Sequence, residues 1–191
     1  MPAMTVPASG EIALLTPLLP HPALPAPPGV SLAAGVEALP GRRLRLRYVL
    51  RGDPGGLSLP AAGAAMRVDG LWQHTCCEAF VAVPGAAAYR EFNFSPSGAW
   101  AAYAFDDYRG AAALPPGPVP SILLQRSGDA LTLSVELAAA WLPPTPRLAL
   151  GLSAVIETRD AARSYWALAH PAPQPDFHHR AGFTLALDLP A

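Results

Sequence analysis

Apolar and polar side chains alternate in four stretches of this chain, which is the pattern of half-buried β-strands. Arginines alternate with apolar residues in 43–51, and similar alternation runs through 131–137 (LTLSVEL), 147–157 (RLALGLSAVIE) and 183–189 (FTLALDL). The residues predicted to point inward are Leu44, Leu46, Tyr48 and Leu50, then Leu131, Leu133, Val135 and Leu137, then Leu148, Leu150, Leu152, Ala154 and Ile156, and finally Phe183, Leu185, Leu187 and Leu189.

Turn-forming segments such as RGDPGG, RSGD and TRDAAR separate these strands, and the only helical feature expected is one short turn in VELAAAWL, before Pro143. Short strands with frequent turns and no strand–helix–strand rhythm predict an all-β fold, an antiparallel β-sandwich.

Three further strands are predicted at 75–83, 88–94 and 99–105, joined by four-residue hairpin loops. Loop length sets the register of a hairpin, so Glu78 should face Asn93, Phe80 should face Glu91, and Phe94 should face Ala99. One face of these strands would then collect the apolar residues Cys77, Ala79, Val81, Phe92, Phe94, Ala99 and Ala101.

The opposite face of the same strands would carry Glu78, Asn93 and Trp100 in one cross-strand row, with Tyr89 and Glu91 beside it. In one interpretation these aromatic rings cover the outer sheet and the acids are solvated. In the other, the row converges on a ligand, and a sugar suits it because sugars stack on rings and hydrogen-bond to carboxylates and amides.

Composition narrows the classes of function. The chain has 191 residues, of which 51% are hydrophobic; we expect a Pro-rich N-terminal extension over residues 1–29 and a single sandwich domain over 30–191. The net charge of -1 argues against a nucleic-acid surface. The chain contains no lysine, which excludes Walker-A, Schiff-base and Ser-x-x-Lys chemistry in their usual forms.

We expect a cytoplasmic protein that does not enter a membrane. The first basic residue is Arg42, which is not the start of a signal peptide, and the apolar stretch IALLTPLL is short and interrupted by Pro17. Cys76 and Cys77 are adjacent, so on a strand they point to opposite faces and should remain reduced thiols rather than pair.

Residues 66–109 carry a family resemblance. Leu71-Trp72, Thr75, Glu78 and Phe80 are followed by Tyr89-x-Glu91-Phe92-Asn93-Phe94-x-Pro96-x-Gly98 and then by Tyr108-Arg109. This block, with SYWALAHPAPQPDFHHRAGF near the C-terminus, resembles the DOMON-like proteins of bacteria, relatives of DOMON domains and of family-9 carbohydrate-binding modules. The resemblance extends from about residue 42 to the C-terminus. It implies a β-sandwich that binds a small ligand, a sugar or haem, without catalysis.

In the carbohydrate-binding relatives two tryptophans clamp the sugar, and the resemblance assigns these positions to Trp72 and Trp166. The full set of ligand-binding candidates is Trp72, Glu78, Glu91, Asn93, Trp100, Arg109 and Trp166. The sequence departs from those relatives where His74-Thr75-Cys76 stands in place of an acidic residue.

Other functions remain open. Non-covalent haem would need axial ligands, for which Met66, His74 and His170 are the main candidates, with His178 and His179 also available. The spacing of His170, Asp176, His178 and His179 matches no zinc motif, so no metal site is predicted.

A glycoside-processing enzyme could use Glu78 and Glu91 as a carboxyl pair. The chain could also be an interaction module whose Pro-rich N-terminus docks a partner, or a homodimer formed through an exposed sheet. The arginines of 43–51 would form either an anion site or, as we favour, a solvated outer face at an edge strand.

Overall fold

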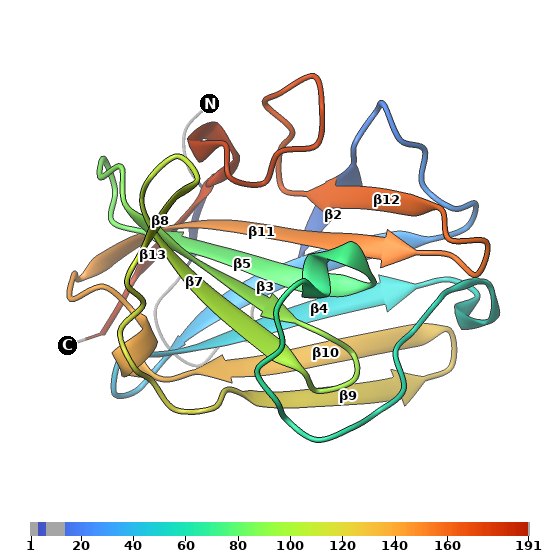
Figure 1. Cartoon of the computed structure of the whole chain (residues 1–191), viewed down its shortest axis with the longest axis horizontal. Coiled ribbons are helices and arrows are strands. Elements are labelled where there is room, and N and C mark those ends of the chain that lie inside the picture. The colour runs from blue at the N-terminus through green and yellow to red at the C-terminus, as the bar shows by residue number, and fades with distance from the viewer. Residues whose placement is uncertain (1–3, 7–13, 191) are drawn as a thin grey trace.

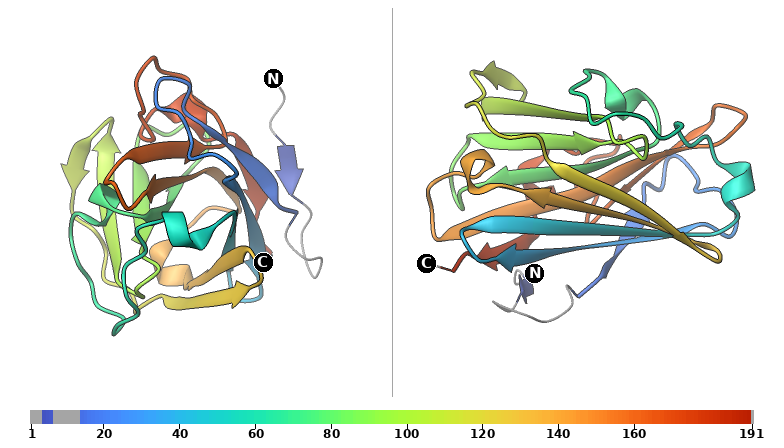
Figure 2. Two further views of the ribbon diagram at one scale, coloured as in Figure 1. Left: turned by 90° about the vertical axis from the view of Figure 1, so that its right-hand side faces the viewer. Right: turned by 90° about the horizontal axis from the view of Figure 1, so that it is seen from below.

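The computed structural model describes residues 4–6 and 14–190, and it is built almost entirely of β-strands (Figure 1). One layer contains β8 (Gly110–Ala112), β7 (Trp100–Asp107), β6 (Tyr89–Phe94), β5 (Cys76–Ala82), β11 (Arg147–Glu157) and β12 (Arg163–Ala167), in that order. The other contains β2 (Thr16–Pro20), β3 (Ser31–Leu39), β4 (Arg43–Arg51), β10 (Ala130–Leu137) and β9 (Ser121–Ser127). The predicted antiparallel β-sandwich is confirmed, and Figure 2 shows its two layers from the end and from below.

Two strands connect parts of the sandwich that are distant in sequence. β2 pairs with β3 on one side and with β12 on the other, so it joins the two layers along one edge. β13 (Leu185–Asp188) pairs with β11, and β1 (Met4–Val6) adds to it in parallel. Much of the predicted N-terminal extension, residues 1–3 and 7–13, lies outside the described residues, whereas Thr16–Pro20 forms part of the sheet.

Four short 3₁₀ turns complete the described chain: η1 (Pro54–Gly56), η2 (Leu71–Gln73), η3 (Ala139–Trp141) and η4 (Arg180–Gly182). The turn η3 confirms the one expected before Pro143. Within residues 4–6 and 14–190, no helix has the length and apolar character needed to cross a bilayer.

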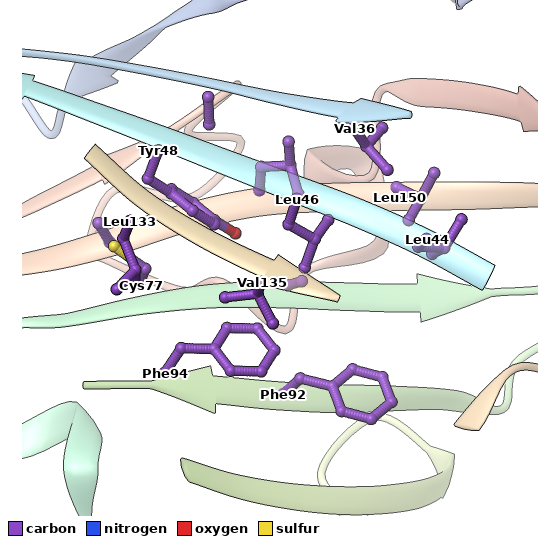
Figure 3. Packing of buried hydrophobic residues seen from close by; sticks show 14 of the residues in the cluster. Val36, Leu44, Leu46, Tyr48, Cys77, Phe92, Phe94, Leu133, Val135 and Leu150 are labelled. Carbon is purple, nitrogen blue, oxygen red and sulfur yellow. The ribbon is translucent and has the colours of Figure 1, made fainter. Parts of the chain in front are cut away.

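The main core lies between the layers and follows the predicted alternation. Leu44, Leu46 and Tyr48 of β4 point inward against Phe92 and Phe94 of β6 (Figure 3). The inward residues predicted for 131–137 and 147–157 are buried there as well. Tyr48 is fully buried, and its hydroxyl donates to the backbone carbonyl of Glu78 at 2.6 Å, which ties the two layers together.

The predicted register is confirmed for one hairpin and wrong for the next. Glu78 faces Asn93 and Phe80 faces Glu91, as expected. However, Phe94 faces Trp100 rather than Ala99, because the loop between β6 and β7 has five residues. A one-residue shift reverses which face each side chain occupies, so Trp100 points into the core and Tyr103 and Phe105 point outward.

The structure also tests the predictions about the position of β4, the packing of Phe183 and the two cysteines. β4 is not an edge strand, because it lies between β3 and β10; Arg45 bonds Glu136 at 2.8 Å and Glu37 at 3.4 Å across the outer face. Phe183 precedes β13 and packs on Phe80 and Tyr89, outside the main core that Leu185, Leu187 and Leu189 enter. Cys76 and Cys77 are both buried free thiols.

Candidate ligand-binding cleft

The outer face of the β5–β6–β7 region, turned away from the main core, contains an open cleft of about 1020 Å³. Strands supply its floor and three loops supply its walls. The lining residues are Leu24, Asp69, Gly70, Trp72, Gln73, Glu78, Glu91, Tyr103, Phe105, Arg109, Val155, Tyr165, Gln174, Pro175, Phe177 and His178.

The wall formed by residues 69–73 presents Trp72 to solvent. Gly70 adopts the left-handed conformation (φ 77°), which lets the chain turn into η2. The hydroxyl of Tyr103 donates to Asp69 at 3.0 Å, which ties this loop to β7; burial, and then that hydrogen bond, raise the pKa of Tyr103 to about 12. Trp72 is therefore held at the rim of the cleft with 48% of its surface exposed.

The floor of the cleft contains two buried acids. Glu78 is only 3% exposed, and its Oε1 has no hydrogen-bond partner among the described residues. Burial, and then the nearby Glu91, raise the pKa of Glu78 well above its usual value. Glu91 accepts a hydrogen bond from Asn93 Nδ2 at 2.8 Å; burial still raises its pKa, although this bond and Arg109 oppose the rise.

Asn93 lies beside Glu78 in a cross-strand row but does not line the cleft. It is fully buried between Glu78 and Ala101, and its Oδ1 has no partner in the described part of the chain. Ser153 of β11 lies on the other side of Glu78 in the same cross-strand row, and its hydroxyl is likewise buried without a partner. Unpaired buried polar groups are costly, so a row of three points to a bound molecule or water.

A hydrogen-bond network holds the 174–178 wall against the sheet. Asp176 accepts hydrogen bonds from Tyr108 at 2.8 Å and from Arg109 at 3.1 Å. Burial alone would raise the pKa of Asp176, but these two bonds lower it below its usual value. The backbone N–H of Arg109 also donates to the hydroxyl of Tyr89 at 3.0 Å, which links the β7–β8 turn to β6.

His178 is the histidine that lines the cleft. Its Nδ1 is 2.8 Å from the Tyr89 hydroxyl, and its Nε2 is 3.6 Å from Glu91 Oε2. Burial, and then the charge of Arg109, lower the pKa of His178 to about 4. The imidazole is therefore neutral at physiological pH, and its contact with Glu91 is not an ion pair.

The structure brings together four of the seven predicted ligand-binding residues. Trp72, Glu78, Glu91 and Arg109 line the cleft, and Asn93 is hydrogen-bonded to Glu91 next to it. Trp100 and Trp166 face the main core instead, and the Trp166 indole donates to Ser164 at 2.9 Å. Trp100 turns inward because of the register shift described above.

Sequence reasoning overlooked the other aromatic residues of the cleft. On β12 the neighbour of Trp166, Tyr165, points to the other face and lines the cleft, together with Tyr103, Phe105 and Phe177. In the segment RSYWA either aromatic residue could face outward, because alternation alone does not say which parity is buried.

The residues considered for haem do not converge. Met66 and His74 are exposed, His74 contacts Glu157 at 3.0 Å, and His170 contacts the carbonyl of Leu19 at 2.7 Å. None of these three lines the cleft. Among the described residues, no cluster of three His, Cys, Asp or Glu side chains is placed to hold a metal ion.

Comparisons with known proteins identify the fold. No protein-family model and no curated protein sequence matches this chain. A candidate carbohydrate-binding protein from Bacteroides uniformis ATCC 8492 matches with a TM-score of 0.62 and 16% identity, over 93% of this chain and 87% of that one. A carbohydrate-binding module of family 9 (CBM9) from Caldicellulosiruptor kristjanssonii, solved with cellotriose, matches with a TM-score of 0.61 and 8% identity, over 97% and 92%.

A CBM9 structure from the same organism, in complex with glucose, matches with a TM-score of 0.57 and 8% identity, covering 98% of this chain and 95% of that one. These identities are low and the coverage of both chains is nearly complete, so the likeness concerns the backbone architecture. The chain thus has a β-sandwich fold that resembles the fold of CBM9 carbohydrate-binding modules.

Proposed function

We propose that this chain is a non-catalytic carbohydrate-binding domain of the DOMON-like group, and that its ligand binds in the cleft over β5, β6 and β7. The observation that carries the proposal is the buried, unpartnered Glu78 Oε1 at the floor of a cleft with aromatic walls. A hydroxyl-rich ligand would supply the missing donor, while its C–H faces would stack on the rings.

Two further observations support a sugar as the ligand. Trp72 of η2 and Tyr165 of β12 both line the cleft, so aromatic surfaces and the two acids share one cavity. Solved proteins with the same architecture hold glucose and cellotriose. Tyr165 would take the clamp role for which Trp166 was considered, because Trp166 is buried in the core.

Tryptophan fluorescence provides a direct test. The chain has four tryptophans, of which Trp100, Trp141 and Trp166 are 5%, 2% and 3% exposed, whereas Trp72 is 48% exposed. Titration with glucose and cello-oligosaccharides should therefore shift or quench the Trp72 emission in a saturable way. Calorimetric titration of the same sugars gives the affinity independently.

Trp72→Ala should weaken sugar binding by about tenfold or more, because it removes one aromatic wall. Leu123→Ala is the matched control, because Leu123 is also an exposed apolar residue but lies on β9, in the other sheet. Unchanged affinity in Trp72→Ala, or equal losses in both variants, would contradict the proposed site. Absence of binding by any tested sugar to the wild type would argue against the function itself.

A further inference from the structure

We propose that the cleft prefers a sugar that bears a protonated amine, with the ammonium group bound between Glu78 and Glu91; this inference rests on the proposed function. Glu78 faces Asn93, so Glu91, two residues away on β6, is its diagonal neighbour on the same face of the sheet. Diagonal neighbours lie about 7–8 Å apart at the backbone, which leaves room for a small cation between two converging carboxyl groups.

The charges around the cleft favour a cation. Three acidic residues, Asp69, Glu78 and Glu91, line the cleft together with one arginine, Arg109. Arg109 is already paired with Asp176 at 3.1 Å, and Asp69 accepts the hydroxyl of Tyr103. Glu78 and Glu91 form no ion pair with an arginine among the described residues, and His178 beside Glu91 is neutral.

The hydrogen-bond acceptors without a donor at the floor of the cleft also favour an amine. Glu78 Oε1 and Asn93 Oδ1 are both acceptors without a donor among the described residues. A sugar hydroxyl brings one donor, whereas an ammonium group brings three donors and a positive charge. Hydrogen bonds that involve a charged group are about twice as strong as neutral ones, so an amine at this position should be preferred to a hydroxyl.

Aromatic side chains enclose the same space. Tyr103 and Phe177 line the cleft together with Trp72 and Tyr165. The faces of aromatic rings attract cations. An anionic sugar would instead meet two buried carboxyl groups and should be excluded.

Calorimetric titration with glucose, glucosamine and N-acetylglucosamine tests the inference; it is done at neutral pH, because acidification would protonate Glu78 and Glu91, whose pKa values are raised. Glucosamine should bind the wild type roughly 10- to 100-fold more tightly than glucose, as expected for one charged hydrogen bond in place of a neutral one. N-acetylglucosamine, in which the charge is removed, should lose this advantage.

Glu78→Gln keeps the shape of the side chain and removes its charge, so it should reduce the preference for glucosamine to within about threefold of glucose; the ratio of the two affinities is the quantity compared, because Glu78 also contacts the sugar in the proposed site. Glu91→Gln is the second variant, in case Glu78→Gln does not fold, and it should reduce the preference in the same way. Glu136→Gln is the matched control, because Glu136 lies on the outer face of the other sheet, paired with arginines.

The outcomes separate the two proposals. Glucose binding with equal or weaker binding of glucosamine would overturn the amine preference and leave the sugar-binding function in place. A preference that survives both Glu78→Gln and Glu91→Gln would overturn the assigned position of the amine. If neither sugar binds the wild type, both proposals fail.

Discussion

At the scale of single residues, Glu78 occupies a position where burial opposes its charge. Moving a carboxylate out of water costs free energy unless it gains partners, and Glu78 Oε1 has none in the described chain. Its pKa and that of Glu91 are therefore both raised, with burial as the main cause. Acids whose pKa values are strongly shifted in a cleft are candidates for a functional site, and this supports the proposed amine site.

The free energy of unfolding should consequently depend on Glu78 in a specific direction. A carboxyl group with a raised pKa in the folded state binds more protons than in the unfolded state, whose pKa is about 4.3. Stability should therefore fall as pH rises above about 4.3 and through the folded-state pKa. Glu78→Gln should flatten this decline and make the protein more stable at neutral pH.

Urea unfolding measured over this pH range checks the prediction for Glu78. A Glu78→Gln variant that is less stable than the wild type at neutral pH would show that the carboxylate has favourable partners after all. Glu136→Gln again serves as the control, and its effect should stay within about 0.5 kcal/mol because it is a surface substitution.

The effect of His178 on the pH dependence of the free energy of unfolding should be opposite to that of Glu78. Its folded-state pKa is about 4, below the ordinary value of 6.5, in surroundings that include Tyr89, Glu91, Arg109 and Asp176. The unfolded state takes up a proton that the folded state excludes, so acidification from about pH 6.5 to 4 should cost up to about 3 kcal/mol. The imidazole resonances of His178, followed by NMR, should titrate near pH 4, and a midpoint near 6.5 would contradict the assignment.

At the scale of elements, the β6–β7 loop determines which side chains reach the cleft. Ser95 and Ala99 close this loop through a backbone hydrogen bond of 2.9 Å, and Gly98 within it has a φ of 94°. A loop of five residues, rather than four, turns Trp100 inward and Tyr103 outward. The aromatic wall on β7 therefore depends on one extra residue in a turn.

Gly98→Ala should destabilise the protein by about 1–3 kcal/mol, because an alanine is strained at positive φ. Gly56→Ala is the control, since Gly56 has no positive φ and an added Cβ would meet nothing within 4 Å. Thermal unfolding of both variants checks this expectation. Equal effects of the two substitutions would show that the backbone conformation of Gly98 is not what the loop requires.

At the scale of the whole molecule, β2 closes the sandwich along one edge. It pairs with β3 in one sheet and with β12 in the other, and β12 carries Tyr165 of the cleft. The segment from residue 21 onward then supplies Leu24 to the cleft wall. The N-terminal region of the described chain therefore contributes to the site, although it is far from β5 and β6 in sequence.

Leu18→Ala should cost about 2–5 kcal/mol, because Leu18 is 3% exposed and belongs to the main core. Leu19→Ala on the same strand should stay within about 0.5 kcal/mol, because Leu19 is 55% exposed. Urea unfolding of the pair measures how far β2 stabilises the sandwich. Similar small effects would indicate that β2 can detach without loss of the core.

The sequence by itself determined the sandwich class, the strands with strong alternation, and the pairing of Glu78 with Asn93. These features depend on local periodicity and on one hairpin whose register was predicted correctly. The strand Ser31–Leu39 was not predicted; its segment SLAAGVEAL has small residues and weak alternation. The motif of residues 71–109 also indicates Trp72, Glu78, Glu91 and Arg109 as binding candidates, and all four line the cleft.

Only the tertiary structure decided which aromatic residues face the cleft. Trp100 and Trp166 are buried, while Tyr103 and Tyr165 line the cleft. Which of these residues reach the cleft depends on the parity of each strand, that is, on whether its odd- or even-numbered residues face the core. Parity depends on loop length and on which face meets the other sheet, and neither is encoded in a short stretch of residues. The closure by β2 and the 174–178 wall likewise arise from contacts between distant segments, whose energies appear only when the chain is folded.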